Sequence, residues 1–360
     1  MRNVRCATTL LLVLPLLIAS THAETVVKLF AGGGNGPDGG PAIGAKLNIP
    51  FATAVDKAGN FYIPEFGGDC VRKIDTHGII TTIAGTGTKG HTGDGGPAAL
   101  ASVNWMHHLM VAPDGNLYIA DTGNFCVRKI DLQSGIISTV AGTGRIGDSG
   151  DGGPATKADF SGIYCVAFDA SGEHLYALDP GDYRVRCVDL KSGIITTVAG
   201  NGLRGKPKNG SDAVTSPLID PRAVAVDAAG NIYILERRGN ALRVVDTHGK
   251  IRTVAGTGKK GLSGDGGDAL KAEFAGPKHI CIDLDQNVLI ADTDNHVIRK
   301  YSPKDGTVTR VAGTGKVGSA GLNGPPESIQ LSQPHGVFVD PAGTLFITDS
   351  YNNRILKLEK

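Results

Sequence analysis

The feature that most constrains this chain is a unit that occurs six times along it. In each copy an Ala-Gly pair closes a short run rich in Thr and Val, and successive pairs lie 53 to 58 residues apart. The alanines of these pairs are Ala31, Ala84, Ala141, Ala199, Ala255 and Ala312. A regular period of this length is typical of arrays such as propellers, in which each unit is one supersecondary motif.

Each copy predicts four short strands. In residues 54–85, for example, apolar runs alternate with tight turns rich in Asp, Asn and Gly, which indicates an antiparallel meander. The chain contains 52 Gly among 360 residues, without a three-residue period, and 41% of its residues are hydrophobic. These values exclude both a collagen-like and a disordered chain.

The two ends of the chain predict how the array closes. Four-stranded antiparallel sheets that repeat radially form a β-propeller. The last copy, residues 335–360, supplies only three strands, whereas residues 25–32 match the fourth strand of other copies, such as 195–200. We therefore predict an all-β, six-bladed β-propeller of four-stranded antiparallel blades, with the final blade closed by the N-terminal strand beside residues 353–358. This closure removes an exposed sheet edge.

The first 23 residues have the pattern of a secretory signal peptide. Arg2 and Arg5 precede an apolar run at 10–19, and small residues follow at 21–23. Ten apolar residues are too few to span a bilayer, so we expect no membrane insertion. We predict a signal peptide at 1–23, one propeller domain at 24–360, and a secreted or periplasmic location.

The charge of the predicted mature chain bears on its partners. Removing Arg2 and Arg5 from the 36 Lys and Arg leaves 34 basic side chains against 35 acidic ones. Nucleic-acid-binding proteins select strongly basic surfaces, so we expect no nucleic-acid partner. We expect the protein to be a monomer.

Specific segments resemble a known family. The sequence GNLYIADTGN at 115–124, followed by VRKID at 127–131, resembles an NHL repeat, and this pattern recurs six times over essentially all of 24–360. Loops such as GDGGPA at 93–98 are similar to those of secreted bacterial NHL proteins and of the teneurin NHL propeller. The resemblance implies a six-bladed propeller used mainly as a binding platform, without fixing the partner.

Polar residues also recur once per copy. We interpret the carboxylates that open the second turn as hydrogen-bond acceptors for that turn rather than as metal ligands. They are Glu65, Asp121, Asp179, Glu236, Asp292 and Asp349. Three residues later stand Gly68, Asn124, Asp182, Gly239, Asn295 and Asn352, residue types that predict a left-handed backbone. Arginines recur in the third strand, and we expect them to pair with neighbouring carboxylates; they are Arg72, Arg128, Arg186, Arg243 and Arg299. We place Asp94 and Asp151, of the GDGG loops, near the caps of short helices.

Function is expected where the copies differ. The position that opens each first strand carries Phe51, His107, Tyr164, Arg222, Lys278 and His335. First strands line the channel of a propeller, so we predict that these six side chains ring one mouth of it. The set is aromatic and basic without a carboxylate, which favours an anionic or carbohydrate-like ligand or an acidic loop of a partner. A variable solvated rim without a ligand is the alternative.

Trp105, the only tryptophan, lies two residues before His107 and has the character of a binding hot spot. The alternative is that Trp105 fills a gap between two blades.

Three classes of function remain open. We predict an exported, non-enzymatic recognition or scaffold module that binds a protein or glycan partner on one propeller face and needs no cofactor. The alternative is a metal-dependent lyase or hydrolase in which His107, His279 and His335 hold zinc, since the propeller lyase of peptide amidation is similar in fold and uses histidine-bound zinc. His107 and His335 occupy the same position relative to the start of their strands, whereas His279 occupies the next position along its strand. Their side chains are therefore expected to point in different directions. The third class is a structural envelope component.

Overall fold

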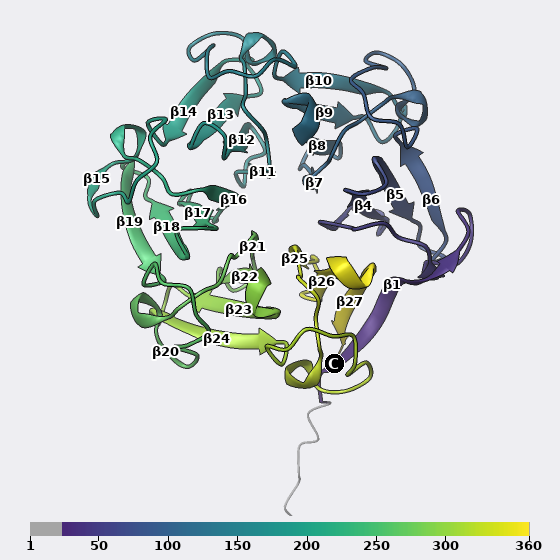
Figure 1. The fold of residues 1–360 in the computed structure, drawn as a ribbon. Helices are drawn as coiled ribbons and strands as arrows, with labels where there is room; N and C mark the ends of the chain where they lie inside the picture. The colour runs from purple at the N-terminus through teal and green to yellow at the C-terminus, as the bar shows by residue number, and fades with distance from the viewer. Residues whose placement is uncertain (1–23, 360) are drawn as a thin grey trace, which may run out of the picture.

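The computed structural model describes residues 24–359, and the predicted signal peptide lies outside them. Six sheets stand radially around a central channel, and the chain passes from one blade to the next around the ring (Figure 1). This arrangement confirms the predicted six-bladed β-propeller.

Three of the six sheets have the expected four strands. Blade 1 contains β3 (Ala54–Val55), β4 (Phe61–Glu65), β5 (Cys70–Ile74) and β6 (Ile80–Ala84); blade 2 contains β7 (His108–Val111), β8 (Leu117–Asp121), β9 (Cys126–Ile130) and β10 (Ile137–Ala141); blade 3 contains β11 (Cys165–Phe168), β12 (His174–Asp179), β13 (Arg184–Asp189) and β14 (Ile195–Ala199).

The other three sheets gain a short fifth strand at the outer edge. Blade 4 contains β16 (Pro221–Val226), β17 (Ile232–Glu236), β18 (Ala241–Val245), β19 (Lys250–Ala255) and the added β15 (Ser211–Asp212). Blade 5 contains β21 (His279–Ile282), β22 (Val288–Asp292), β23 (Val297–Ser302), β24 (Thr307–Ala312) and the added β20 (Gly267–Asp268). Blade 6 contains β25 (Gly336–Val339), β26 (Leu345–Asp349), β27 (Arg354–Glu359), β1 (Val26–Gly36) and the added β2 (Ile43–Ala45).

The connections hold eight short 3₁₀ helices within residues 24–359. They are η1 (Ala98–Leu100), η2 (Thr122–Asn124), η3 (Ala155–Lys157), η4 (Ala213–Thr215), η5 (Ala269–Lys271), η6 (Thr293–Asn295), η7 (Pro326–Ser328) and η8 (Ser350–Asn352). None of the helices in this part of the chain is long and apolar enough to cross a membrane.

The N-terminal strand closes the ring as predicted. β1 pairs antiparallel with β27, with Val26 opposite Glu359, Leu29 opposite Leu356 and Gly32 opposite Arg354. The first and last strands of the chain therefore lie side by side in blade 6 (Figure 1). β1 also extends beyond the predicted strand to Gly36, where it pairs in parallel with β2.

The recurring Ala-Gly pair has a packing reason. In blade 1, Ala84 is fully buried, and Gly85 has φ +85°. A Cβ on Gly85 would overlap the carbonyl oxygen of Asp69, the residue directly before β5. The same conflict would arise at the glycine that follows each of the other five alanines. Only glycine combines this backbone conformation with so close an approach of two strands.

The core lies between the faces of neighbouring blades. One cluster joins blades 2 and 3 through Tyr118, Phe160, Phe168 and Ile195, which are at most 5% exposed. The short apolar strands thus stabilise the ring by packing sheet against sheet, and each blade depends on its neighbours.

Deleting residues 24–32 removes the strand that joins the first and last parts of the chain. We expect the variant to lose the single cooperative unfolding transition, because the edge of β27 becomes exposed and blade 6 loses buried side chains such as Val27. Thermal unfolding followed by calorimetry tests this. Lys28→Ala, which keeps the strand and removes one exposed hydrogen bond to Asn323, is the control. A deletion variant that melts like the parent would show that closure is not needed.

Candidate functional site

A buried carboxylate fixes the segment that leads into the innermost strand of each blade. In blades 2 to 6 it accepts a hydrogen bond from the backbone N–H three residues before the channel-mouth position. These bonds run from Asn104 to Asp121 (2.8 Å), Ser161 to Asp179 (2.6 Å), Ile219 to Glu236 (2.7 Å), Ala275 to Asp292 (2.8 Å) and Ser332 to Asp349 (2.7 Å). The predicted role as acceptor is confirmed, although the common donor lies in the incoming segment rather than in the turn.

The residue three positions after each carboxylate was predicted to be left-handed, and this prediction was wrong by one residue. In blade 2 the backbone with positive φ belongs to Phe125, and Asn124 instead donates from Nδ2 to Asp121 (2.8 Å). In blade 4 the longer Glu236 reaches into the place of that side chain, where a Cβ on Gly239 would overlap it. Asn therefore accompanies Asp in blades 2, 5 and 6, and Gly accompanies Glu in blades 1 and 4, because each pair fills the same space; in blade 3, Asp182 accompanies Asp179.

In blade 2 a buried arginine connects this carboxylate to the loop before the blade. In β9, Arg128 donates to the carbonyl oxygens of Ser102 and Thr92 (both 2.9 Å) and pairs with Asp94 (2.6 Å). Its guanidinium also lies 3.8 Å from Asp121. The expected pairing with a carboxylate is confirmed for each predicted arginine. Four of them pair with a carboxylate in the preceding loop: Arg72 with Asp38, Arg128 with Asp94, Arg186 with Asp151 and Arg299 with Asp265. Arg243 instead pairs with Glu236 within its own blade.

Asp94 and Asp151 are therefore not helix caps. Pro97 and Pro154 are the residues that precede η1 and η3, and neither helix has a side-chain cap. The two carboxylates turn instead toward arginines on the next sheet, because a buried guanidinium requires a negative partner.

The six predicted channel-mouth side chains lie together, one from each blade, where the innermost strands begin. We call this set the channel-mouth ring; it consists of Phe51, His107, Tyr164, Arg222, Lys278 and His335. Phe51 stacks on His335 and His107 stacks on Tyr164, each with centroids 4.1 Å apart. The space between the six side chains is about 10 Å³, roughly that of one water molecule. The ring therefore plugs the channel rather than surrounding an open mouth.

Two neighbouring cations of the ring have no counter-charge. Arg222 is 7% exposed and lies 4.1 Å above the ring of Tyr164, and neither Arg222 nor Lys278 forms an ion pair within residues 24–359. The nearby carboxylates are engaged elsewhere, Asp220 with Arg237 (2.8 Å) and Asp294 with Lys260 (3.5 Å). Burial lowers the pKa of Arg222 to about 10, and burial together with the charge of Arg222 lowers the pKa of Lys278 to about 8.

The two histidines of the ring are held neutral. Nδ1 of His107 lies 3.1 Å from the carbonyl oxygen of Trp105, and Nδ1 of His335 lies 3.0 Å from that of Gln333. Since a carbonyl only accepts, each Nδ1 carries the proton and each Nε2 offers a lone pair. Lys278 donates to Nε2 of His335 (3.0 Å). Burial and the neighbouring cations lower the pKa of both histidines well below the usual value.

His279 lies in the next layer of the channel, opposite His108. Their ring centroids are 4.7 Å apart. Within residues 24–359, the one group of three His, Cys, Asp or Glu side chains with converging donor atoms is His108, Cys165 and His279, whose atoms lie within 4.8 Å of one another. The structure therefore does not bring His107, His279 and His335 together, because successive residues of a strand point in different directions.

Trp105 lies beside the ring at the surface and does not fill a gap between blades. It is 46% exposed, with Nζ of Lys89 4.2 Å from its ring centroid. Phe66 stacks between Trp105 (6.1 Å) and Phe51 (4.6 Å), so an aromatic stripe runs from the surface to the channel. Sequence analysis missed Phe66, although it is the one aromatic residue at its repeat position, where the other copies carry Thr122, Pro180, Arg237, Thr293 and Ser350.

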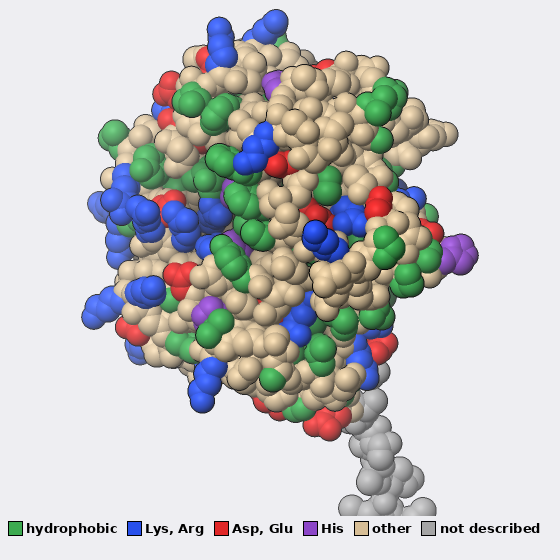
Figure 2. Space-filling model, turned by 45° about the vertical axis from the view of Figure 1, so that its right-hand side comes forward, with side chains coloured by type: hydrophobic (Ala, Val, Ile, Leu, Met, Phe, Trp, Pro, Cys, Tyr) green, Lys and Arg blue, Asp and Glu red, His purple; other side chains and the backbone are tan. Residues whose placement is uncertain are grey.

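In the space-filling view, Lys and Arg side chains gather in a band at the left, next to hydrophobic and His side chains (Figure 2).

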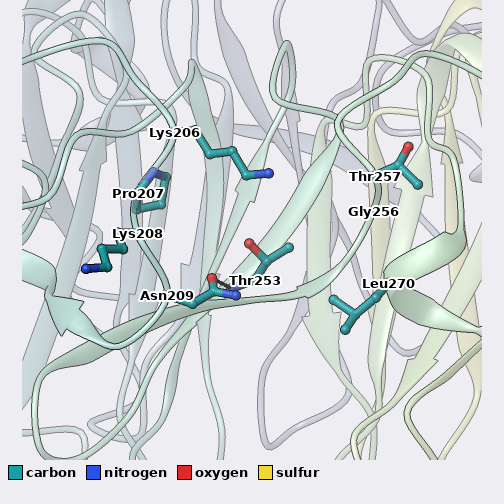
Figure 3. A pocket seen from close by; sticks show the side chains of 8 residues that line it. All are labelled: Lys206, Pro207, Lys208, Asn209, Thr253, Gly256, Thr257 and Leu270. Carbon is teal, nitrogen blue, oxygen red and sulfur yellow. Dashed lines mark hydrogen bonds between the residues drawn. The ribbon is translucent and has the colours of Figure 1, made fainter.

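A second hollow, of about 550 Å³, lies at the outer part of blade 4 (Figure 3). Lys206 points across it, whereas Lys208 points the other way. The side chain of Asn209 is already engaged, since its Oδ1 accepts a hydrogen bond from the backbone of Thr253 (2.9 Å). This hollow lacks a converging set of polar groups, and the channel mouth is the candidate site.

Comparison with known proteins gives matches to NHL-repeat proteins. A family model described as "NHL repeat" matches residues 331–358. The chain is 30% identical over 250 residues to Protein SUPPRESSOR OF QUENCHING 1, chloroplastic, of Arabidopsis thaliana (66% of this chain, 23% of that protein). It is 25% identical over 272 residues to NHL repeat-containing protein 2 of Bos taurus (68% and 37%) and 28% identical over 284 residues to Teneurin-1 of Gallus gallus (74% and 8%). The chain thus spans well under half the length of each of these curated relatives.

Among solved structures, the chain is similar to an auxiliary nutrient binding protein from Bacteroides ovatus, with a TM-score of 0.67 and 16% identity, covering 93% of this chain and 76% of the other. At this identity the likeness shows the fold alone.

Arg299→Met tests the buried arginine connection. Arg299 is fully buried and donates to the carbonyl oxygens of Glu273 and Ser263 (both 2.7 Å). We expect the free energy of unfolding to fall by about 3–5 kcal/mol, because the fully buried Asp292 loses its positive partner, whereas Asp265 keeps its pair with Arg310. Urea denaturation measures this. Arg145→Met is the control, since the side chain of Arg145 is 75% exposed and its pair with Asp159 contributes little to stability. Equal losses in the two variants would contradict the role of the buried arginine.

Stability should rise with pH above about 8 because of Lys278. The folded chain lowers the pKa of Lys278 from 10.5 to about 8, so between these values the unfolded chain binds the proton more strongly than the folded chain does. The free energy of unfolding therefore increases as pH rises through this window. Urea denaturation at several pH values should show a smaller rise for Lys278→Met than for the parent. Lys304→Met, at an exposed turn between β23 and β24, should keep the parent slope. Equal slopes for Lys278→Met and the parent would refute this role.

Proposed function

Since this chain is an NHL-repeat six-bladed β-propeller, we propose that it is a binding module that presents its channel-mouth face to a protein or glycan partner. The likeness to a structural neighbour, an auxiliary nutrient binding protein, supports a binding role. The pattern of residues 1–23 supports action outside the cytoplasm. The proposal includes no catalytic step and no cofactor.

The uncompensated positive charge of Arg222 and Lys278 is the observation that carries this proposal. A buried charge without a partner is costly, and the cost falls when an anion approaches. Arg222 offers a planar guanidinium, which recognises carboxylate or phosphate groups with two hydrogen bonds. We therefore propose that an acidic group of the partner docks against Arg222 and Lys278 at the plugged mouth.

The surroundings of the ring supply further contact area. Trp105 is 46% exposed and Tyr351 is 54% exposed, and Tyr351 lies 6.0 Å from His335. On the opposite side of the ring, Arg238 is 67% exposed in its side chain. Trp, Tyr and Arg dominate the energetics of protein interfaces because they combine large contact area with directional polar groups. The partner is expected to place apolar surface beside its acidic group.

The alternative zinc-dependent lyase or hydrolase lacks a comparable observation. It requires three ligands around one point, and its histidines lie in two layers of the channel. In the upper layer, Lys278 already donates to the lone pair of His335. No second function is proposed.

Binding of acidic probes tests the proposal. We expect the full chain to bind a polyglutamate peptide or an acidic oligogalacturonate, measured by isothermal titration calorimetry, and to ignore polyglutamine and a neutral oligosaccharide. Arg222→Met and Lys278→Met should each weaken binding about tenfold, or ~1.4 kcal/mol. Added salt should weaken binding further.

Lys304→Met is the matched control because it removes an exposed cation far from the ring along the chain. Thermal unfolding of each variant shows whether it is folded. The proposal fails if folded Arg222 and Lys278 variants bind like the parent, or if neutral probes bind as well as acidic ones. The peptide and the oligosaccharide distinguish the two classes of partner.

A further inference from the structure

Below the channel-mouth ring lies a second, apolar space. It has a volume of about 260 Å³ and is lined by side chains of the innermost strands, such as Leu109, Val224 and Ile280, without a single Lys, Arg, Asp or Glu. It extends to the far ends of these strands, where Met110 and Val226 are half-buried. We call it the lower channel. The ring closes it on one side, so a ligand enters from the opposite face.

Two histidines form the inner end of the lower channel. His108 comes from blade 2 and His279 from blade 5, which stand opposite each other in a ring of six. The other blades carry small residues at the same position, namely Ala52, Cys165, Ala223 and Gly336. These small residues leave room for the two imidazoles to meet across the channel, with centroids 4.7 Å apart.

Backbone hydrogen bonds fix the tautomer of both imidazoles. Nδ1 of His108 accepts from the N–H of Val166 (3.4 Å), and Nδ1 of His279 accepts from the N–H of Val337 (3.3 Å). Both bonds reach the innermost strand of the next blade. A neutral imidazole that accepts at Nδ1 carries its proton at Nε2. Burial keeps both rings neutral, since it lowers the pKa of His279 to about 4 and that of His108 well below the usual value.

The inner end of the lower channel therefore presents two N–H donors. Its lining also includes Thr53, whose Oγ1 is buried without a hydrogen-bond partner and bonds neither imidazole. Nε2 of His279 is buried without a hydrogen-bond partner. The two Nε2–H groups cannot satisfy each other, because both donate. The thiol of Cys165 donates to the carbonyl oxygen of Val224 (3.5 Å), and its sulfur is only a weak acceptor. A buried polar group without a partner costs roughly 1–3 kcal/mol, so an acceptor from outside the chain is favoured here.

The same hydrogen bonds argue against a metal ion in this cluster. A histidine that ligates a metal through one ring nitrogen donates its other N–H to an acceptor. In His108 and His279 the other nitrogen accepts from a backbone amide instead. The convergence of His108, Cys165 and His279 thus forms a site for a hydrogen-bond acceptor rather than for a cation.

We propose that the lower channel binds a small monocarboxylic acid with an apolar body, whose carboxylate accepts hydrogen bonds from Nε2–H of His108 and His279. The apolar body lies against the aliphatic wall. Arg222 and Lys278, in the ring directly above, supply positive charge, and the wall contains no acid to repel the ligand. A volume of about 260 Å³ suits a benzoate-sized or short aliphatic acid. This site is separate from the proposed partner-binding face, because the ring lies between them.

Calorimetric titration of the full chain with benzoate and with hexanoate tests the site. We expect one molecule bound per chain and much weaker binding of benzyl alcohol, which lacks the carboxylate. His279→Phe should weaken binding at least tenfold because it removes one donor and keeps an aromatic ring. Val226→Trp should also weaken binding, because it narrows the entrance without touching either histidine. His77→Phe is the control, since the side chain of His77 is 86% exposed in a turn at the outer part of blade 1.

Nitrogen-15 NMR of the histidine rings gives an independent readout, with Nε2 protonated in both His108 and His279. The proposal is overturned if no acid binds to the folded parent, if benzyl alcohol binds as tightly as benzoate, or if His279→Phe and Val226→Trp fold and bind like the parent. A titration of the full chain with zinc alone tests whether the cluster of His108, Cys165 and His279 binds a metal instead. Stoichiometric zinc binding that is lost in Cys165→Ala would assign the cluster to a metal and overturn the proposal.

Discussion

The buried contact between an arginine and a carboxylate, which recurs in blades 1, 2, 4, 5 and 6, is the interaction on which the rest of this structure depends. In blade 5, for example, the carboxylate holds the incoming segment by its backbone N–H, and the arginine holds the preceding loop by its carbonyl oxygens. Each blade is thereby tied to the connection that brings the chain into it. The residue at the channel mouth follows three positions after the fixed N–H, so the same contact sets where the channel-mouth ring lies.

Much of this architecture could be predicted because the repeats make local patterns visible six times. The Ala-Gly pairs marked the blade boundaries, and the missing fourth strand of the last copy indicated closure by the N-terminal strand. The residues of the channel-mouth ring were found as the positions where otherwise similar copies differ. Their contacts were not predictable, since the stacking of Phe51 on His335 joins residues at opposite ends of the sequence.

The errors also have physical reasons. Asp94 pairs with Arg128, 34 residues away, and sequence spacing gives no sign of a contact between a loop and the next sheet. Asn124 has a residue type that tolerates positive φ, but its side chain was selected for the hydrogen bond to Asp121. That His108 and His279 face each other can be inferred only when the six copies are placed on a circle, because blades 2 and 5 then stand opposite each other. The position of the six side chains at the strand openings predicted that they ring a mouth of the channel, but not that large flat side chains brought to one point stack and close it.

The pairing of β1 with β27 has a consequence for biosynthesis. Val26 lies opposite Glu359, so the ribosome produces one half of this contact about 330 residues before the other. At about 5–20 residues per second, the first strand waits for roughly 15–65 s before its partner emerges. During this interval blades 1 to 5 can assemble in order, but the nascent chain remains an open arc with two unsealed ends. Synthesis of β27 in blade 6 is therefore the step that allows the arc to close into a circle.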